Sequence, residues 1–496
     1  MRIERLRSLT WIALAVFLAL GPSAAASAAP PGYVIITSQE IRALSTKLTS
    51  FAAHKASRGF TVTIFDESDW GGVGLTDDAA AEALRGFLQT IDGPLGVDYV
   101  LIIGDPRLNT GPVPMKAVYP RNQNAIGTNP SGGSVVCGFA QELVPSDYYY
   151  AELDGDWDLN GNGKYGEFGQ YDAVGTPTGD FGPGGVERNY DIAVGRIPVY
   201  KSTSNPSLLA NGIVALDSIL QKTIDYQNTP LAGIAWRKSA LIAIEGANRF
   251  FYGEQVKDDI LDPNGFTSVY RVYDADTCYT NLPQTCNPPL TSAPDALTCS
   301  IANTTAGWLA EPRGMVTWFT HGSGSGAAAI TNTSQALLLD NDYPSITWQA
   351  SCYNSLPSNT NNISYALLKN GAIATLGATR VSHGPGSPVD LQNDPGHHAG
   401  IVGMGYWFWE RVIYQQDSVG NALMGVKQDN TLYGRCWYWQ NYTGFNLYGD
   451  PEISIYSHAI DAVPSSSPGV LALLTALLAG GGLLGVRSLH RFVSRS

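Results

Sequence analysis

The sequence has few basic residues. Its 30 Lys and Arg stand against 43 Asp and Glu, so the formal net charge of the 496-residue chain is −13. Proteins that bind nucleic acids neutralise phosphates with clustered Lys and Arg, so this balance argues against a nucleic-acid partner. Aromatic residues are not scarce: 11 Trp, 25 Tyr and 15 Phe within a 44% hydrophobic share argue against disorder. The length predicts two or three domains.

An apolar segment near the start predicts export. Leu9–Leu20 is uncharged, follows three arginines and precedes two Ala-x-Ala signals, Ala24–Ala26 and Ala26–Ala28. A basic start, a short apolar run and small residues before a cleavage point are the layout of a secretory signal peptide. We therefore expect residues 1–29 to be a signal peptide. The alternative is an N-terminal membrane anchor, for which the apolar run is short.

A second apolar segment stands near the end of the sequence. Gly469–Val486 carries no charge, follows a Pro- and Ser-rich stretch, and precedes Arg487, Arg491 and Arg495. Its length just suffices to cross a bilayer, with the arginines on the cytoplasmic side. The tail, residues 458–496, resembles bacterial C-terminal sorting signals of the PEP-CTERM type. The resemblance implies a secreted or cell-surface bacterial protein whose tail meets the membrane or a sorting machinery, and is either cleaved or retained.

Short apolar runs rich in β-branched residues alternate with helix-like stretches through the rest of the chain. This alternation predicts an α/β fold with buried parallel strands. The pattern restarts after a helical stretch, Pro206–Gln227, so we expect two consecutive doubly wound subdomains, residues 30–205 and 206–457. The expected strands are Tyr33–Thr37, Val62–Phe65, Tyr99–Ile103, Asp191–Val199, Ala240–Ile244, Val269–Tyr273, Met315–Phe319, Ile346–Trp348 and Ala372–Leu376, with helices near Ser38–Ser57 and Asp77–Thr90.

A Gly-, Asp- and Asn-rich insertion, residues 154–185, must form a loop. Within it, residues 156–167 fit the calcium-loop pattern D-x-[DN]-x-[DN]-G-x5-E. Alternate side-chain oxygens can converge on one ion, Gly161 permits the sharp turn, and a final Glu closes the shell. The candidate ligand positions are Asp156, Asp158, Asn160, Asn162, Lys164 and Glu167. We expect a structural Ca²⁺ and no organic cofactor; the alternative is a solvated turn, because no clear helix pair flanks the loop.

A histidine and a cysteine, which together could form a nucleophile and its base, end neighbouring predicted strands of the second subdomain. His321 follows the apolar run 314–320, and Cys352 follows the run 345–350. Adjacent parallel strands would bring both to the carboxyl edge of the sheet, where open α/β folds build their sites. An imidazole can activate a thiol as base or ion-pair partner. Backbone N–H groups of Gly322 and Cys352 could then form an oxyanion hole.

These residues also have other interpretations. A strand-ending Cys is commonly a buried core thiol, and a strand-ending His commonly a hydrogen-bonding residue. The glycine- and serine-rich stretch 322–326 resembles a serine nucleophile turn only superficially, because its pattern is not G-x-S-x-G. His397 and His398, with Asp390 and Asp394, lack the helical spacing of a zinc motif and indicate a surface loop.

The second subdomain resembles the gingipain-type cysteine peptidases, family C25 of the caspase-like clan. The signature of that family is an apolar strand with His-Gly, then an apolar strand with Ala-x-Cys or Ala-Cys. Here VTWFT ends at His321-Gly322 and ITWQ ends at Ala350-Ser351-Cys352. Further similar stretches are YVLIIGDP, Ser146–Tyr149, DIAVGRIP at 191–198 and Phe445–Pro451, so the resemblance spans most of residues 33–456.

The resemblance implies a caspase-like α/β/α sandwich and endopeptidase activity. It assigns Cys352 as nucleophile and His321 as general acid/base. Family members orient this histidine with an acidic residue just after an earlier strand, and the similar position here is Glu245. The other interpretation of Glu245 is a solvent-facing acid at a strand end.

Specificity departs from the family pattern. Members that cleave after Arg or Lys place an acid in the segment after the orienting Glu, whereas this segment, 247–254, is aromatic and contains Arg249. A pocket lined by Phe250 or Phe251 would favour apolar substrate residues, while Glu254 could serve a basic one. The loop carrying His383 falls where the family has a pocket wall.

The sequence has six cysteines, and in an exported chain their pairing in disulfides has to be explained. If Cys352 is the nucleophile, Cys278 and Cys286 suit a local bridge, which leaves Cys299 to pair with Cys137 or Cys436. The sequence thus predicts a secreted or surface cysteine endopeptidase that acts on protein or peptide substrates. The alternatives are an inactive surface-binding protein on the same scaffold and, less favoured, a serine hydrolase.

Overall fold

The computed structural model describes residues 29–121, 126–128, 134–136, 141–169, 178–246, 249–274, 292–385, 390–393, 400–429 and 436–459. The predicted signal peptide and the apolar tail segment lie outside these residues. So do Cys137, Cys278, Cys286 and the His397–His398 pair. Within the described residues, no helix combines the length and the apolarity that crossing a bilayer requires.

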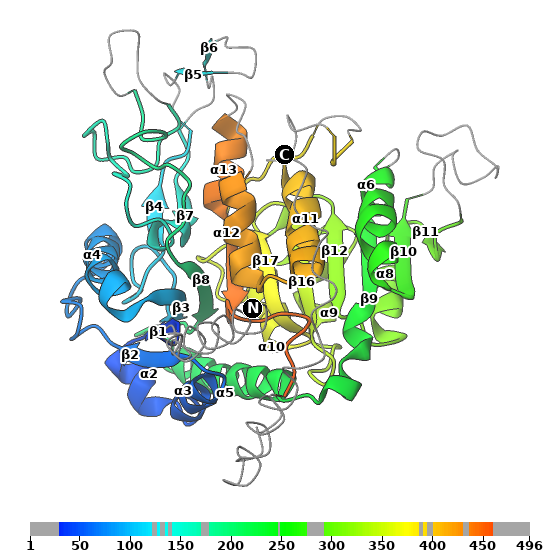
Figure 1. The fold of residues 1–496 in the computed structure, drawn as a ribbon, viewed down its shortest axis with the longest axis horizontal. Coiled ribbons are helices and arrows are strands. Elements are labelled where there is room, and N and C mark those ends of the chain that lie inside the picture. Colours follow the sequence, from blue (N-terminus) through cyan, green and yellow to red (C-terminus); the bar gives the residue numbers. More distant parts are fainter. Residues whose placement is uncertain are drawn as a thin grey trace, which may run out of the picture.

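One sheet of eleven strands runs through the molecule (Figure 1). Each predicted strand is present, and all neighbours pair in parallel except β17 and β18. Parallel strands are buried on both faces, which explains their continuous apolar character. In sheet order the strands are β11 (Ala296–Leu297), β10 (Ser268–Tyr273), β9 (Ser239–Ile244), β12 (Met315–Phe319), β16 (Ser345–Ala350), β17 (Ala372–Ala378), β18 (Phe445–Gly449), β8 (Ala193–Pro198), β3 (Val97–Gly104), β1 (Gly32–Ile36) and β2 (Thr61–Phe65).

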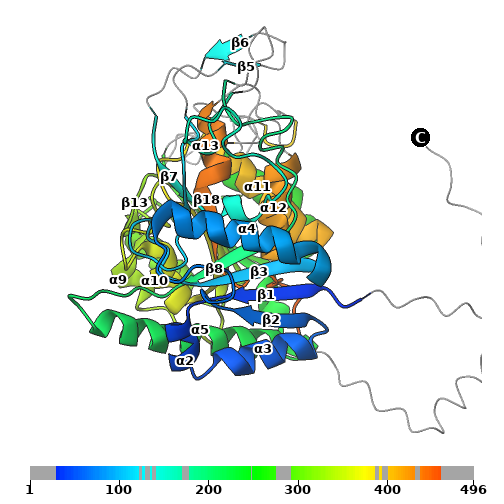
Figure 2. The ribbon, with the colours of Figure 1, turned by 90° about the vertical axis from the view of Figure 1, so that its left-hand side faces the viewer.

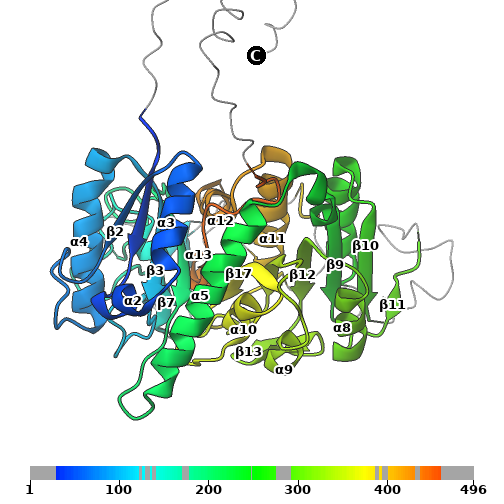
Figure 3. The ribbon, with the colours of Figure 1, turned by 90° about the horizontal axis from the view of Figure 1, so that it is seen from below.

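Helices cover both faces of this sheet, which confirms the α/β/α class. In the second half, α6, α11, α12 and α13 lie on one face and α8, α9 and α10 on the other (Figure 3). Two segments, Val256–Leu261 and Arg411–Gln415, continue α6 and α11 as π-helical turns. The helices are α2 (Gln39–Leu44), α3 (Leu48–Ser57), α4 (Asp77–Leu95), α5 (Ser207–Gln227), α6 (Phe251–Gln255), α8 (Ile301–Leu309), α9 (Thr333–Ala336), α10 (Ile363–Lys369), α11 (Ile401–Glu410), α12 (Val419–Asp429) and α13 (Cys436–Gly444).

Besides the main sheet, the described residues form three small sheets. The strands β13 (Gly322–Ser323), β14 (Gly326–Ala327) and β15 (Thr331–Asn332) follow β12 directly. The hairpin of β5 (Ile126–Thr128) and β6 (Ser134–Val136) stands apart from the main sheet (Figure 2), and β4 (Lys116–Val118) pairs with β7 (Val144–Ser146). In the described parts of the insertion, 154–169 and 178–185, the backbone forms turns and bends, as the composition predicted.

The predicted helix at 38–57 is in fact two helices, α2 and α3. The break falls at Ser45 and Thr46, whose hydroxyls both donate hydrogen bonds of 2.6 Å to the Asp217 carboxylate on α5. The backbone N–H of Thr46 donates to the same carboxylate at 3.0 Å. A tertiary contact from a helix 170 residues away therefore ends α2, and no local pattern could reveal it.

The two expected subdomain sheets are joined into one. After β17, the chain returns through α11, α12 and α13 and enters the sheet as β18, antiparallel to β17 and beside β8. Tyr448 of β18 pairs with Arg196 of β8, so the seam between the halves is a hydrogen-bonded strand pair. One sheet replaces the two that the restart of the pattern after Pro206–Gln227 predicted, because the alternation of apolar runs did not mark residues 445–449 as a strand.

Buried charged residues stabilise this seam between β8 and β18. The Arg196 guanidinium is fully buried and donates to both carboxylate oxygens of Asp147, at 2.7 and 2.6 Å. Its third nitrogen donates to the Val113 carbonyl at 2.7 Å, and the Asp147 backbone N–H donates to the Asn446 side chain at 2.8 Å. Three of the motifs found in the sequence, around 146–149, 191–198 and 445–451, thus meet at one place.

The Gly-Asp-Pro-Glu segment after β18 is tied to the first half. Lys55 on α3 forms ion pairs with Asp450 and, at 2.7 Å, with Glu452. The Tyr33 hydroxyl donates to Asp450 at 2.8 Å, and burial together with that carboxylate raises the pKa of Tyr33. The end of the second half is therefore anchored on the N-terminal half.

Candidate active site

His321 and Cys352 end neighbouring strands at the same height. β12 and β16 pair in parallel with Phe319 opposite Ala350, and the Thr320 N–H donates to the Ala350 carbonyl at 3.2 Å. His321 and Cys352 each stand two residues beyond this last pair. His321 is exposed and Cys352 is half-buried. The register therefore brings both residues to one point of the carboxyl edge.

Gly322 lies directly against the backbone of Cys352. A β-carbon at position 322 would lie 2.3 Å from the Cys352 carbonyl oxygen and 2.9 Å from the Cys352 nitrogen. Only glycine allows these two segments to approach so closely. The backbone groups of both predicted oxyanion-hole residues are therefore adjacent.

The Cys352 sulfur contacts the loop that follows β17. Its Sγ atom lies 3.4 Å from the Ser382 backbone nitrogen and 3.8 Å from the Ser382 hydroxyl oxygen. The same sulfur lies 3.6 Å from the Ser382 carbonyl oxygen, so both the backbone and the side chain of Ser382 contact it. Ser382 was not recognised from the sequence, because nothing in a sequence tells which residue of a loop faces a thiol on another strand.

The backbone around Cys352 is strained and held in place. Tyr353 has φ 61°, a left-handed conformation that is unfavourable for a large side chain, and its N–H donates to the Arg380 carbonyl at 3.0 Å. The buried Asn354 amide donates to the carbonyls of Cys352 at 3.2 Å and of Ser323 at 3.0 Å. Asn354 thus ties the loop after Cys352 to the loop after His321.

Glu245 directly follows β9, the other neighbour of β12 in the sheet. Its N–H donates to the Phe319 carbonyl at 3.0 Å, which continues the ladder between β9 and β12. The Glu245 carboxylate accepts a hydrogen bond from the hydroxyl of Thr320, the residue before His321. Among the contacts of the described residues, this carboxylate bonds to Thr320 and not to the imidazole of His321.

The three pocket residues predicted on segment 247–254 are buried. Phe250 and Phe251 are each 5% exposed and pack in the core, where the Phe251 ring centre lies 4.1 Å from that of Tyr252. Glu254 is 5% exposed; it pairs with Arg271 at 3.2 Å and accepts from the Tyr273 hydroxyl at 2.9 Å. Burial raises the pKa of Glu254, and Arg271 opposes this shift. Glu254 therefore already has its cation and cannot serve a basic substrate residue.

His383 forms part of a network that holds the loop beside Cys352. Its Nε2 atom lies 2.9 Å from Nη2 of Arg121, and its backbone exchanges two 2.8 Å hydrogen bonds with the Asn441 side chain on α13. Burial and the Arg121 charge lower the pKa of His383 to about 4, so it is neutral near pH 7. His383 fits a wall of the site, and Arg121 reaches it from the N-terminal half.

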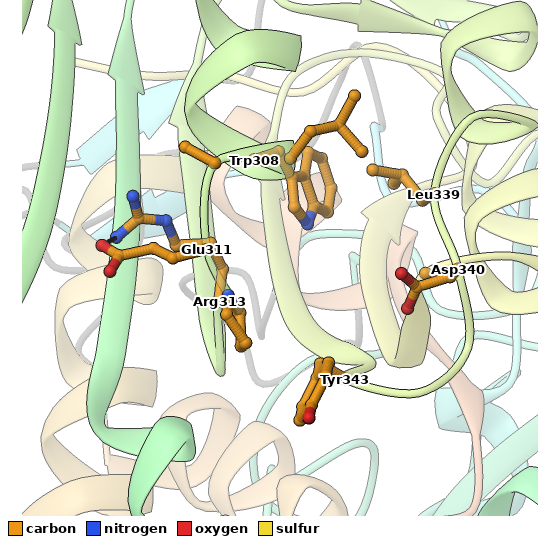
Figure 4. A pocket seen from close by; sticks show the side chains of 10 residues that line it. Trp308, Glu311, Arg313, Leu339, Asp340 and Tyr343 are labelled. Atoms are coloured by element: carbon orange, nitrogen blue, oxygen red, sulfur yellow. Dashed lines mark ion pairs between the residues drawn. The ribbon is translucent and has the colours of Figure 1, made fainter.

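A hollow lies at the opposite edge of the sheet from His321 and Cys352. It has a volume of about 250 Å³ and lies at the amino ends of β12, β16 and β17 (Figure 4). Its walls include Trp308, the ion pair of Glu311 with Arg313, and Tyr343. Ligand sites in parallel sheets form at the carboxyl edge, so this hollow is separate from the candidate active site.

The predicted calcium loop has oxygen-rich side chains that bond within the loop. Glu167 is buried and accepts from the Asn160 and Asn162 amides at 3.0 and 2.6 Å, while Asp158 accepts from the Gly163 N–H at 3.0 Å. Asp156, Asn162 and Lys164 are exposed. In the described part of the chain, no three His, Cys, Asp or Glu side chains lie close enough together to hold a metal ion.

A further carboxylate, which the sequence analysis did not identify, lies beside this loop in the same insertion. Asp180 is fully buried and accepts from the backbone N–H groups of Glu167, at 2.8 Å, and Asn160, at 3.4 Å. Burial raises its pKa to about 7, and no ion pair neutralises it among the described residues. A buried carboxylate without a cation fits the donor set of a calcium site.

The cysteine pairing differs from the expectation where it can be seen. Cys299 is a buried free thiol, not part of a bridge to Cys137 or Cys436. Burial, with help from Asp274, raises the pKa of Cys299 to about 12, so it is unreactive near neutral pH. Cys352 is the other free thiol of the described residues.

Comparisons with known proteins identify the family. No curated protein matches this chain. The structure of "the Arg specific cysteine proteinase gingipain R (RGPB)" is similar, with a TM-score of 0.56 and 14% identity over 86% of this chain and 79% of that chain. The complex of the pro- and mature domains of RgpB from Porphyromonas gingivalis gives a TM-score of 0.54 and 14% identity, covering 85% and 79%. The sequence model of peptidase family C25 matches residues 26–456, so the chain belongs to peptidase family C25 and is a cysteine-type endopeptidase acting on protein substrates.

Proposed function

We propose that Cys352 is the nucleophile of this endopeptidase and His321 its general acid/base. The observation that carries the proposal is the strand register, which sets His321 and Cys352 at one height on adjacent parallel strands. The contact between Gly322 and the Cys352 backbone supports it. The alternative is an inactive surface-binding protein on the same scaffold, but such a protein has no chemical reason to retain both residues, so their presence argues for the enzyme.

The reaction follows from this arrangement. The Cys352 thiolate, held near the Ser382 donors, attacks the peptide carbonyl, and the oxyanion binds to the N–H groups of Gly322 and Cys352. His321 then donates a proton to the leaving amine, and water hydrolyses the thioester. Glu245 acts one step away: its carboxylate fixes Thr320 and thereby the backbone that carries His321.

Active-site labelling tests this proposal. Iodoacetamide at neutral pH should modify Cys352, while Cys299 stays unmodified because it is buried with a raised pKa. Peptide mapping by mass spectrometry locates the label in the wild type, in Cys352→Ala and in His321→Ala. Labelling of the Cys352 peptide should also slow in His321→Ala. Equal rates in wild type and His321→Ala would contradict the assigned role of His321.

Replacing Gly322 by alanine should disable the oxyanion hole. The added methyl group would overlap the Cys352 carbonyl, 2.3 Å from its position, and push the nucleophile out of place. We expect kcat/KM for a peptide substrate to fall by about 100-fold or more. Gly324→Ala is the matched control, because its nearest contact, at 3.0 Å, is the movable Asn359 side chain. Equal losses in both variants would show that Gly322 has no special role.

We further propose that the loop 156–167 binds a structural calcium ion. Asp158, Asn160 and Glu167 would supply side-chain oxygens, and Asp180 a fourth from outside the loop. Rotation of the Asn160 amide would turn its oxygen toward the ion and release Glu167 from the bond it now accepts. The ion would neutralise the buried Asp180 and so stabilise the insertion and the α13 helix it packs against.

Calcium should therefore raise thermal stability. At a Ca²⁺ concentration roughly 100 times the dissociation constant, we expect the Tm to rise by about 3 °C or more relative to chelator. Asp158→Asn and Glu167→Gln should lose this increase. Asp154→Asn, an exposed acid outside the ligand positions, should keep it. An unchanged wild-type Tm and no heat of binding at millimolar Ca²⁺ would leave the solvated turn as the correct interpretation.

The two predicted export segments suggest where the enzyme is located. We propose that residues 1–29 direct secretion and that residues 469–486 place the enzyme at the cell surface or are removed by a sorting enzyme. The intact mass and N-terminal sequence of the mature protein from a bacterial culture test both parts. A mature protein that begins at Met1 would contradict the signal peptide.

A further inference from the structure

Arg249 lies near the candidate active site, at the end of the strand beside β12. It follows β9 and lies at the carboxyl edge of the sheet, half-exposed. Its side chain crosses Gly246, where a β-carbon would lie 3.2 Å from the Arg249 Cδ atom. The guanidinium carbon then lies 5.1 Å from the centre of the Phe319 ring. Arg249 thus extends from the end of β9 over the end of β12, the strand that carries His321.

The same ring links Arg249 to the nucleophile. A β-carbon at Gly384 would lie 3.1 Å from the Phe319 ring, so the loop that contains Ser382 and Gly384 packs on it. Ser382 contacts the Cys352 sulfur at 3.4 Å. Phe319, which is 7% exposed, therefore contacts both Arg249 and the loop beside Cys352. Two successive contacts at the carboxyl edge, Arg249 with Phe319 and Phe319 with this loop, thus connect the guanidinium to the surroundings of the nucleophile.

The environment of Arg249 is aromatic and has no counter-ion of its own. Tyr252 also packs on Phe319, with ring centres 5.7 Å apart, and the Arg249 charge acts on Tyr252. No carboxylate of the described residues lies within ion-pair distance of the Arg249 guanidinium. By contrast, Arg121 pairs with Glu142 at 3.2 Å, and Arg271 pairs with Glu254. In a chain with net charge −13, an Arg without a carboxylate partner at the edge of the sheet that carries His321 and Cys352 requires an explanation.

We infer that Arg249 selects substrates with an acidic side chain at the residue whose carbonyl Cys352 attacks. A carboxylate there would supply the missing counter-ion and make a charge-assisted, bidentate contact with the planar guanidinium. An apolar side chain would leave that charge unpaired, and a basic one would be repelled. The inference rests on the proposed role of Cys352, and it replaces the apolar and basic choices that the sequence left open, since Phe250, Phe251 and Glu254 are buried.

Peptide substrates that differ only at this position test the inference. The full chain is assayed on fluorogenic peptides with Glu, Gln, Leu or Arg before the scissile bond. We expect kcat/KM for the Glu peptide to exceed that for the isosteric Gln peptide by about 10- to 100-fold. Added salt should reduce this ratio, because the site is partly exposed.

Charge-changing variants connect the preference to Arg249. Arg249→Gln should abolish the Glu-over-Gln ratio, and Arg249→Glu should favour the Arg peptide. The control is Arg42→Gln, which removes one positive charge from α2, where the Arg42 side chain is 49% exposed and pairs with Asp66. That variant should keep the wild-type ratio.

The outcomes separate this inference from the proposed function. Wild-type cleavage that favours Leu or Arg, or a Glu preference that survives in Arg249→Gln, would overturn the role of Arg249 while Cys352 remained the nucleophile. If no peptide were cleaved and Cys352 resisted labelling, both the inference and the proposed function would be wrong.

Discussion

Replacing Cys352 by alanine should lower kcat/KM for peptide hydrolysis by about 10⁴-fold or more, because the proposed acyl-enzyme forms on the Cys352 sulfur. His321→Ala should cost a similar factor, and the double variant little more, since the two residues act as one unit. The measurement is the initial rate of cleavage of a fluorogenic peptide. Unchanged circular dichroism and Tm would show that the fold is intact.

Glu245→Gln provides a graded comparison. In the structure the Glu245 carboxylate accepts from Thr320, and an amide oxygen can accept the same hydrogen bond. We therefore expect a much smaller loss than for His321→Ala. A loss as large as that of His321→Ala would mean that the carboxylate contacts the imidazolium directly during catalysis, as the family resemblance implied. A Cys352→Ala enzyme with wild-type activity would refute the mechanism.

Replacing Arg196 by methionine should lower the free energy of unfolding by about 3–5 kcal/mol, the largest stability effect that we expect from one substitution at the seam. Arg196 is fully buried, and its removal leaves the Asp147 carboxylate without the two hydrogen bonds of 2.7 and 2.6 Å that it accepts. An uncompensated buried charge is the costly product of such a change. Chemical denaturation followed by fluorescence gives the difference.

A double variant separates the ion pair from simple packing. Adding Asp147→Asn to Arg196→Met removes the stranded charge and should restore part of the lost stability. Arg42→Met is the matched control, because the Arg42 side chain, which pairs with Asp66 at 3.1 Å, is 49% exposed, and its loss should cost less than about 1 kcal/mol. A loss for Arg196→Met as small as that of the control would mean that the seam depends on strand pairing alone.

Much of the fold was accessible from the sequence, for a physical reason. Strands buried on both faces require continuous apolar runs, and all nine predicted strands occur in the structure. β18 was missed because Phe445–Gly449 contains Asn446, whose side chain bonds to the Asp147 backbone rather than to solvent. Its position between the halves follows from tertiary contacts, so the single continuous sheet could not be read from the chain.

The residues of the candidate site also fall into two groups: those that the sequence identified and those that only the structure revealed. The order of strands and the residues that end them pointed to His321, Cys352 and Gly322, because parallel neighbours share one edge. Ser382, Asn354 and Asp180 come from loops whose direction depends on packing, and no sequence pattern marks them.

The sequence by itself determined the class of the protein: an acidic α/β chain with a thiol and an imidazole at successive strand ends. Only the tertiary structure decided how its charges are used. Glu254 and Arg249 are five residues apart in one segment, yet Glu254 turns into the core and meets Arg271, whereas Arg249 turns along the sheet edge and meets no carboxylate among the described residues. Whether a charge is neutralised internally or available to a substrate depends on which distant residue packs against it, and that is set by the fold as a whole.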